Sequence, residues 1–573
     1  MKEYLEPQIK TACGRTFGAE LNSRNIPIAF EKPKVAEHGD IATNIAMQLS
    51  KTFKKNPRQI ATEIVAQLQF DSSIVEKVEI AGPGFINFHF TKNYFQNELK
   101  TILEIEKSFG KSFANKGKKA QVEFVSANPT GPLTVGHGRN AVFGDTVARL
   151  LEWSGYDVTR EYYFNNAGRQ MRVLGDSVRL RYLELIDEKI RFPQFSNNDA
   201  SNFANALSVG EIPFPEDYYQ GEYITDIAKS LHTQFGDSLR NENAEGKFKQ
   251  QAESEIFEDI KKTCKRLGIA FDVFFNENTL YETGMVKEVI EEFKQRGVAY
   301  ESEGALWLKK EILGSEKDKV IVKSTGEPTY RLPDIAYHRE KIRRGFDLMI
   351  DILGSDHIAT YPDVIAGLNA LGENEGANKI KVLIHQFVTI LQDGEVVKMS
   401  TRKANYITLD ELMDEVGADV VRYFFLMRSI GSHLNFDLKL AKEQSDENPV
   451  YYLQYAHARI ASIIRFAAES QEPRPKSQTV DFSMLKEEAE ISLIKMLRTF
   501  PEIVENVATN FEPHLLCEYL HEVAGVFHKF YHDHRVVTDN KELTSARLDL
   551  CSGAKIVLGN GLAILGITAP EKM

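Results

Sequence analysis

Residues that suit phosphate chemistry gather in the segment "NPTGPLTVGHGRN" (128–140), between an apolar run and an amphipathic one. Gly131 and Gly136 have no side chain that would keep a flat base or a phosphate at a distance. His137 can donate a hydrogen bond to a phosphoryl oxygen as charge develops on it. A helix that begins here would add free N–H groups and a partial positive charge. The spacing alone predicts a nucleotide site, and a glycine-lined turn with an incidental histidine is an equal alternative.

A second candidate segment is "VVKMSTRKAN" (396–405), in which cations crowd a loop rich in Ser and Thr. Lys398, Arg402 and Lys403 together suit the grip on a polyphosphate. Asp393-Gly394 predicts a tight hairpin turn just before them, and the next helix is expected near Leu409. A solvated charged loop is the alternative.

A third candidate is Glu123, a carboxylate inside the apolar run "QVEFVSA" (121–127). An unpaired carboxylate in a buried strand is costly, so Glu123 needs a cationic partner. That partner is either a ligand or an internal Arg or Lys.

Alternating strands and helices must position these residues. Residues 121–127 and 158–164 predict buried parallel strands. The helix between them places Phe143, Val147 and Leu151 on one face. After a polar, mostly helical insertion over about 170–300, the sheet resumes at 346–357 and 381–390. This order predicts an α/β fold with a Rossmann-like, doubly wound parallel sheet, in which ligands bind where the carboxyl ends of strands lead into helices.

The remaining chain divides into further units, and its 573 residues fit three or four domains. We predict a compact α/β domain over 1–106 and a linker rich in Lys, Ser and Gly over 107–120. The nucleotide-binding domain then spans 121–447, and a helical domain spans 448–573.

Composition limits the class of protein. The net charge is −12, so the excess of Lys and Arg that usually marks a nucleic-acid partner is missing. The apolar run 554–568 is shorter than a membrane span and contains Asn560, which favours a buried helix. The N-terminus lacks a signal-peptide pattern, and four scattered cysteines do not form a disulfide or zinc framework. We expect a cytoplasmic protein with no membrane association.

The first two segments resemble the HIGH and KMSKS signatures of class I aminoacyl-tRNA synthetases, about 260 residues apart. Further stretches resemble the arginyl-tRNA synthetase family over nearly the whole chain. They are "EHGDIATNIA", "VEFVSANPTGPLTVGHGRNA", "PEDYYQGEYI", "TYRLPDIAYH", "KMSTRKANY", "GADVVRYFFL" and "GITAPEKM".

The resemblance implies an arginine–tRNA ligase that uses ATP to form arginyl-adenylate. The arginyl group then passes to the 2′-hydroxyl of the terminal adenosine of tRNA(Arg). Mg²⁺ is expected on the phosphates, and activation is expected to need bound tRNA. The family also implies an N-terminal appended tRNA-binding domain, a helical C-terminal anticodon-binding domain and a monomer.

By the same resemblance, individual residues receive roles. The predicted catalytic residues are His137, Lys398 and Lys403. The predicted ATP-binding residues are Pro129, Thr134, Gly136, His137, Asn140, Lys398, Met399 and Ser400. The predicted arginine-binding residues are Glu123, Asn128, Tyr330 and Asp334, and no protein metal site is expected. Asp356 ends a predicted strand at the same crevice and is a further arginine-binding candidate, with a capping role as the alternative.

Contacts to tRNA are predicted at Tyr452, Tyr455, Arg459 and Arg535. For the tyrosines, burial in the core is the alternative. His521, His528 and His532 share a helical face, but without a clear further ligand they favour stacking over metal binding.

Three positions depart from the family pattern. Thr134 replaces the first histidine of HIGH, Thr401 replaces the second lysine of KMSKS, and Ala404 replaces an expected glycine. These departures predict weaker assistance at the phosphates. They also leave open a tRNA-binding protein that no longer activates an amino acid. A cysteine synthetase would be expected to show clustered zinc ligands, and a lysine or glutamate synthetase would not need Glu123 with Asp334.

Overall fold

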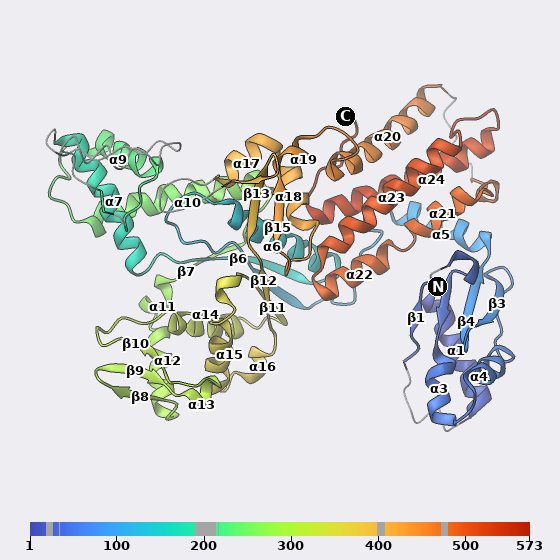
Figure 1. Ribbon diagram of the computed structural model, residues 1–573, viewed down its shortest axis with the longest axis horizontal. Helices are drawn as coiled ribbons and strands as arrows, with labels where there is room; N and C mark the ends of the chain where they lie inside the picture. Colours follow the sequence, from blue (N-terminus) through green and yellow to red (C-terminus); the bar gives the residue numbers. More distant parts are fainter. Residues whose placement is uncertain are drawn as a thin grey trace.

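The computed structural model describes residues 1–18, 27–33, 35–187, 190, 214–215, 217–397, 407–470 and 480–573. A central parallel sheet lies between two lobes on one side and a bundle of long C-terminal helices on the other (Figure 1). The N-terminal domain, blue in Figure 1, attaches below these helices.

The central sheet has the strand order β12-β11-β5-β6-β7, and every pairing is parallel. Its strands are β5 (Lys119–Glu123), β6 (Asp157–Phe164), β7 (Val273–Asn276), β11 (Leu348–Gly354) and β12 (Ile380–His385). From β5 the chain moves outward through β6 and β7, and later fills the other side with β11 and β12. The order therefore reverses between β5 and β11, which places a ligand crevice at their carboxyl ends. The predicted α/β class is confirmed.

Two helices, α6 (Val135–Trp153) and α14 (Arg331–Arg343), cover opposite faces of this sheet. Glu123 pairs with Lys341 of α14. A Cβ atom added at Gly144 of α6 would lie 2.3 Å from Cβ of Phe124, the next residue along the chain. Because successive side chains of an extended strand point to opposite faces, the two helices must lie on opposite sides.

The structure divides the insertion predicted over 170–300. Helices lie between β6 and β7, namely α7 (Arg169–Ile186), α9 (Glu222–Phe235), η4 (Ala244–Phe248) and α10 (Lys249–Arg266). Strand β7 lies inside the predicted insertion, yet it pairs with β6 as an edge strand of the central sheet. The run "VFFN" is too short to be distinguished as a strand by periodicity.

A second lobe lies between β7 and α14 and includes a three-stranded antiparallel sheet of order β10-β9-β8. Its elements are α11 (Asn278–Glu282), α12 (Met285–Gln295), β8 (Ala299–Ser302), β9 (Ala305–Leu308), α13 (Lys310–Leu313) and β10 (Lys319–Val322). After β11 follow η5 (Ser355–His357), α15 (Tyr361–Ala370) and α16 (Asn374–Ala377).

A small sheet of order β14-β13-β15 joins the central domain to the helical one. It contains β13 (Val388–Gln392), β14 (Glu395–Val396) and β15 (Leu434–Asp437), next to α17 (Leu409–Val416), α18 (Ala418–Leu426) and α19 (Leu438–Lys442). The predicted hairpin turn is confirmed, because Asp393 and Gly394 join β13 to β14 with φ values of 51° and 82°. The strand predicted over 381–390 is two strands, β12 and β13.

The C-terminal domain is helical, as predicted. It contains α20 (Pro449–Ser470), η7 (Phe482–Met484), α21 (Glu488–Leu497), α22 (Phe500–Asn510), α23 (Pro513–Asp533) and α24 (Lys541–Leu565). Within the described ranges, α24 is the one helix long and apolar enough to cross a membrane. Most of its apolar side chains are buried among neighbouring helices, which fits the core helix predicted from Ala554 onward.

The N-terminal domain has a sheet of order β1-β2-β4-β3 with helices beside it. Its elements are α1 (Lys2–Phe17), β1 (Phe30–Glu31), η1 (Ala36–His38), β2 (Ile41–Thr43), α3 (Ile45–Phe53), α4 (Pro57–Val65), β3 (Val75–Ala81), β4 (Phe85–Phe90), α5 (Lys92–Ile105) and η2 (Glu106–Ser108). Arg498 binds Glu98 of α5 at 3.2 Å, and Gln96 Nε2 donates to the Leu485 carbonyl at 3.0 Å. These contacts dock α5 on the helical domain.

Candidate active site

His137 lies in the first turn of α6, at the carboxyl edge of the sheet. The backbone N–H of the N-cap residue Thr134 donates to His137 Nδ1 at 3.1 Å. Burial, together with the charge of His385, lowers the pKa of His137 to about 4. The imidazole is therefore neutral at pH 7 and carries its proton on Nε2. The geometry leaves Nε2–H as a donor at the positive end of a helix dipole.

The chain leaves β5 through a strained turn. Val125 and Ser126 have φ values of 66° and 38°, in the left-handed region that a β-branched residue rarely adopts. Asn140 holds this turn, because its Oδ1 accepts from the Val125 N–H at 2.6 Å and its Nδ2 donates to the Ile352 carbonyl at 2.8 Å. Since both ends of its amide bind backbone, we interpret Asn140 as a residue that positions the loop.

The helical lobe lies against the loop that follows this turn. The Tyr223 hydroxyl of α9 donates to the Thr130 carbonyl at 2.6 Å, and a Cβ atom at Gly131 would lie 2.9 Å from that hydroxyl. Gly131 therefore makes room for the lobe, whereas a Cβ atom at Gly136 would meet no atom closer than 3.7 Å. The exposed Asn128 donates to Gln170 Oε1 of α7 at 2.7 Å. Pro129 is buried.

Residues that follow the second signature segment contact the first segment. Lys398, Met399, Ser400, Thr401, Arg402, Lys403 and Ala404 lie outside the described residues. On their C-terminal side, Thr408 forms an antiparallel bridge with Thr134, and the Leu409 N–H donates to the Leu133 carbonyl at 2.8 Å. The described chain thus resumes, at Thr408, directly beside the N-cap of α6.

Three carboxylates form a row across neighbouring strands on the face covered by α14. Asp351, Glu123 and Glu161 are register partners on β11, β5 and β6. Lys341, which is fully buried, binds both Asp351, at 2.6 Å, and Glu123. Burial opposes the charge of Lys341, but Asp351 and Glu123 raise its pKa, so it stays protonated. Arg344 binds Glu161 at 2.8 Å.

Lys341 is the cation that Glu123 was predicted to need. Of the two partners predicted for Glu123, a ligand or an internal Arg or Lys, the structure shows the internal one. Lys341 binds Glu123 Oε2, and Ser126 Oγ donates to Oε1 at 2.9 Å. A role of Glu123 toward a substrate amine stays a prediction.

Beside the row lie two carboxyl groups without an internal cation. Glu277 directly follows β7 and is 6% exposed, and Asp334 lies in the first turn of α14. Neither forms an ion pair within the described part of the chain. Oε2 of Glu277 and the buried Tyr163 hydroxyl form no hydrogen bond of ordinary geometry, and the weak contact between Tyr163 and Glu277 lowers the pKa of this carboxyl only against a larger rise from burial. A cationic ligand would satisfy all of these groups.

The pKa values of Glu277 and Asp334 also indicate that these carboxyl groups lack a cationic partner. Burial, together with the charge of Asp334, raises the pKa of Glu277 to about 7. Burial also raises the pKa of Asp334 to about 6, against the opposing charge of His338. Sequence reasoning missed Glu277 because β7 was hidden in the predicted insertion. The available signal was an acidic residue at the end of a short apolar run.

Two predicted arginine-binding residues are exposed. Tyr330 precedes Asp334 by one helical turn, and its side chain is 73% exposed. The Asp356 side chain in η5 is equally exposed and lies 3.6 Å from His357. Their roles toward arginine stay predictions.

Sequence reasoning also missed His385, the last residue of β12. It pairs in register with Gly354 of β11, at the same edge of the sheet as His137. Arg139, buried beneath, donates to the next carbonyl, that of Gln386, at 2.9 Å. The sequence signal was a histidine at the end of a predicted strand.

Aromatic side chains cluster on α20 and α23. Tyr451 and Tyr455 stack with centroids 6.2 Å apart, while Tyr452 lies 4.7 Å from the His521 ring. The exposed Arg459 lies over the rings of Tyr455 and Tyr531, at 5.8 and 5.2 Å. The tyrosines are half-buried, so they form a platform at the surface of the core.

Arg535 lies beyond the end of α23 and is exposed. Its backbone carbonyl accepts from Arg547 at 2.7 Å. Among the residues that the structure describes, no group of three or more His, Cys, Asp or Glu side chains could hold a metal ion.

Comparison with known families accounts for most of the chain. The family model described as "tRNA synthetases class I (R), catalytic domain" matches residues 98–422. "Arginyl tRNA synthetase N terminal domain" matches 3–90, and "DALR anticodon binding domain" matches 453–573. The arginine–tRNA ligase of Desulfotalea psychrophila is 50% identical over 95% of this chain and 94% of its own length.

The chain belongs to the arginyl-tRNA synthetase family. The arginine–tRNA ligase of Salinibacter ruber is 47% identical over the full length of both chains. The fold matches the Thermus thermophilus arginyl-tRNA synthetase with a TM-score of 0.72 over both whole chains, at 22% identity. The resemblance drawn from the signatures is therefore confirmed.

Proposed function

We propose that this synthetase activates L-arginine with ATP and transfers the arginyl group to the 2′-hydroxyl of the terminal adenosine of tRNA(Arg). The observation that carries the proposal is the position of the carboxylates Glu277 and Asp334, which form no ion pair within the described residues. Glu277 is buried at the end of β7 and Asp334 lies in the first turn of α14, both beside the sheet at which α6 presents His137.

The pair suits a guanidinium group. Arginine offers five donors in a planar fork, which two carboxylates and the Tyr163 hydroxyl can receive. Lysine is a compact point charge, so it would leave some of these buried acceptors unpaired. Sites of this kind reject the wrong ligand by about 10⁴-fold.

In the first step, an oxygen of the arginine carboxylate attacks the α-phosphorus of ATP in line. The bond to the β-phosphate oxygen breaks, and pyrophosphate leaves with that electron pair. His137 Nε2–H and the first N–H groups of α6 stabilise the charge on the phosphates. Lys398 and Lys403 would add positive charge from the segment that returns at Thr408.

In the second step, the 2′-hydroxyl of tRNA attacks the carbonyl carbon of the adenylate and AMP leaves. Mg²⁺ would come with the phosphates of ATP, since phosphate oxygens and waters are its usual ligands. Within the described ranges the chain offers no cluster of its own for a metal.

We assign tRNA contact to the helical domain and to residues 1–106. The platform of Tyr452, Tyr455 and Arg459 can stack unpaired bases without an excess of positive charge. Beside it, a cavity of about 340 Å³ lies between α17 and α20. Its lining includes the Tyr451 ring and the side-chain amides of Gln444, Asn448 and Gln454, to which a base could bind.

The test is ATP–pyrophosphate exchange with arginine, lysine and the other amino acids, with and without tRNA(Arg). Exchange with arginine, and with no other amino acid, supports the proposal. Exchange with lysine would overturn the assignment of Glu277 and Asp334. If folded protein binds tRNA but gives no exchange, the protein only binds tRNA and the departures at Thr134 and Thr401 are disabling.

A further inference from the structure

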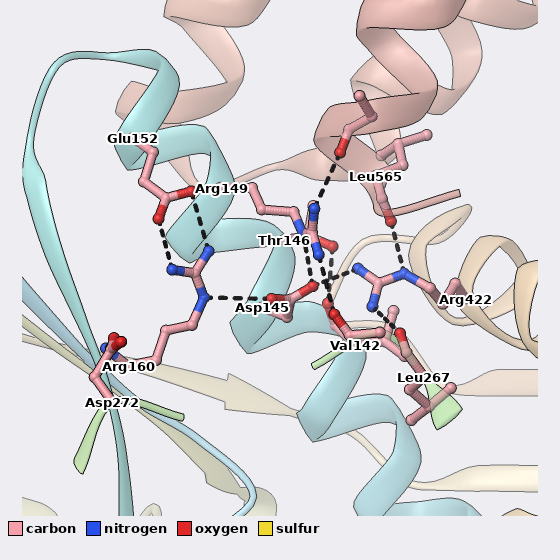
Figure 2. A network of polar contacts seen from close by, with 12 residues as sticks. Val142, Asp145, Thr146, Arg149, Glu152, Arg160, Leu267, Asp272, Arg422 and Leu565 are labelled. Atoms are coloured by element: carbon pink, nitrogen blue, oxygen red, sulfur yellow. Dashed lines mark hydrogen bonds and ion pairs between the residues drawn. The ribbon is translucent and has the colours of Figure 1, made fainter. Parts of the chain in front are cut away.

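One buried carboxylate, Asp145 in the middle of α6, holds three arginines (Figure 2). Its side chain is 1% exposed and accepts from Arg149 and Arg422 at 2.7 Å, and from Arg160 at 3.4 Å. Burial alone would raise the pKa of Asp145, but the charges of Arg422 and Arg149 lower it below its usual value. We call Asp145, Arg149 and Arg422 the arginine hub.

Arg422 joins α6 to two helices far away in the sequence. From α18, its Nε donates to the Leu565 carbonyl and its Nη1 to the Leu267 carbonyl, both at 2.8 Å (Figure 2). Leu565 ends α24 of the helical domain, and Leu267 caps α10 of the helical lobe. Carbonyl groups at a helix C-terminus have no partner inside the helix, so a buried cation is well matched to them.

Arg149 repeats the pattern from α6 itself. Its Nη2 donates to the Gly268 carbonyl at 3.2 Å and its Nη1 to the Ala563 carbonyl at 3.5 Å. Each hub arginine thus contacts Asp145, the end of α24 and the end of α10. A single carboxylate orients both guanidinium groups that bind the two helix ends.

The turn after α24 fits Arg422 closely. A Cβ atom at Gly566 would lie 2.2 Å from Arg422 Nη2, and Gly566 has a φ of 69°. One turn earlier on α18, Asp419 accepts from the Thr568 N–H at 3.2 Å. Asp419 also accepts from Gln454 Nε2 of α20 at 2.8 Å. Residues 565–568 are therefore held at both ends by α18.

These contacts form a continuous connection between the two proposed ligand surfaces. Gln454 adjoins Tyr455 of the aromatic platform, and its bond to Asp419 leads to Arg422 and Asp145. Asp145 lies eight residues after His137, or about 12 Å along a rigid helix. Any shift of α24 against α18 must therefore strain bonds to the helix that presents His137.

We propose that the arginine hub couples tRNA binding on the helical domain to ligand binding at the N-terminus of α6, with Asp145 and Arg422 as positioning residues. The inference rests on the proposed function, because it needs both ligands. Coupling between sites is reciprocal, so ATP and arginine must strengthen tRNA binding by the same factor as tRNA strengthens theirs.

The test measures the Kd of tRNA(Arg) alone and with saturating arginine plus α,β-methylene-ATP, whose α–β bridge cannot be cleaved. The coupling factor is the ratio of the two Kd values. We expect about fivefold or more for the unaltered protein. For Arg422→Lys we expect a factor within twofold of one, because a lysine cannot reach Asp145 and both carbonyls together.

Arg160→Lys is the matched control. Arg160 also binds Asp145, but its other partner is Glu152 of α6, and it contacts neither α24 nor α10 through its side chain. Its coupling factor should equal that of the unaltered protein. Where Arg422→Lys does not melt cooperatively, Arg149→Lys takes its place, because Arg149 is 29% exposed and its loss is better tolerated.

An unchanged factor in the folded hub variant, or a factor of one in the unaltered protein, would overturn the inference. Arginylation of tRNA(Arg) by the unaltered protein is measured in parallel. If charging occurs without coupling, only the hub inference fails. If neither arginine nor tRNA is bound or charged, the proposed function itself fails.

Discussion

Glu123 and Asp351 are register partners on neighbouring parallel strands, and the ammonium group of Lys341 binds both of them. Two adjacent buried carboxylates would repel each other without this cation. The pairing explains how a parallel sheet tolerates acidic side chains at its centre, and it fixes α14 over the crevice.

Lys341→Met should therefore destabilise the fold strongly. Removing one partner of a buried ion pair costs about 3–5 kcal/mol, since the remaining charges are left uncompensated. Chemical denaturation of the full-length protein measures this free energy of unfolding, in the transition of the domain that contains α14. Lys55→Met, which removes an exposed pair with Glu63, should cost no more than about 1 kcal/mol. Equal effects of the two variants would contradict the assigned role of Lys341.

Glu277→Gln should weaken arginine recognition. Loss of a charged hydrogen bond costs about 1.5–3 kcal/mol, so kcat/KM for arginine should fall roughly ten- to a hundredfold. The KM for ATP should not change. Glu282→Gln, at an exposed position in α11, is the control and should behave as the unaltered protein. An unaffected arginine KM in Glu277→Gln would remove Glu277 from the pocket.

The same pair predicts a pH dependence. The pKa values of Glu277 and Asp334 are raised to about 7 and about 6 without a ligand. Their ionisation on raising the pH from about 4.5 to above 7 therefore destabilises the unliganded fold, because the unfolded chain ionises more easily. Bound arginine cancels this penalty. The increase in Tm on adding arginine should be larger at pH 8 than at pH 5.5, as thermal melts would measure, and the difference should shrink in Glu277→Gln.

His137→Asn should lower kcat about 10²- to 10³-fold, as expected for loss of a donor to the developing charge. The pKa of His137, near 4, predicts no ionisation of this group between pH 6 and 8. Pre-steady-state activation measured over that range tests both statements. His532→Ala, exposed on α23, provides the comparison. A kcat that follows a group with a pKa near 6.5 would contradict the neutral tautomer.

Tyr455→Ala should raise the KM for tRNA, because base stacking on an aromatic ring contributes about 1–3 kcal/mol. The KM values for arginine and ATP should stay within twofold. Charging kinetics at varied tRNA measure this directly, with Phe113→Ala, 72% exposed in the linker segment, as the control. A parallel rise in all three KM values would indicate general unfolding of α20.

Features of the fold that depend on contacts between residues close in the sequence could be predicted from local sequence patterns. The strand at β5, the start of α6 and the turn at Asp393-Gly394 follow from short-range sequence rules. The histidine tautomer also depends on a contact only three residues away, between Thr134 and His137. These features could be predicted because their partners are neighbours in the chain.

Other features depend on contacts between residues far apart in the sequence, which no local sequence pattern predicts. The need of Glu123 for a cation could be predicted, but not that Lys341 would supply it, because α14 comes much later in the chain. Glu277 was missed since its strand is short and follows a long helical lobe. The second constraint on Gly131 could not be predicted for the same reason, because Tyr223 approaches it from a distant helix.

The row of carboxylates under α14 affects the charge that a neighbouring ligand must carry. Lys341 and Arg344 form ion pairs with Asp351, Glu123 and Glu161, whereas Glu277 and Asp334 form none within the described residues. A cationic ligand at Glu277 and Asp334 would therefore supply positive charge where no internal ion pair does. An anionic amino acid would be repelled by this pair, and a neutral one would leave any charge on it uncompensated. The charge of the ligand's side chain therefore contributes to selection alongside its shape.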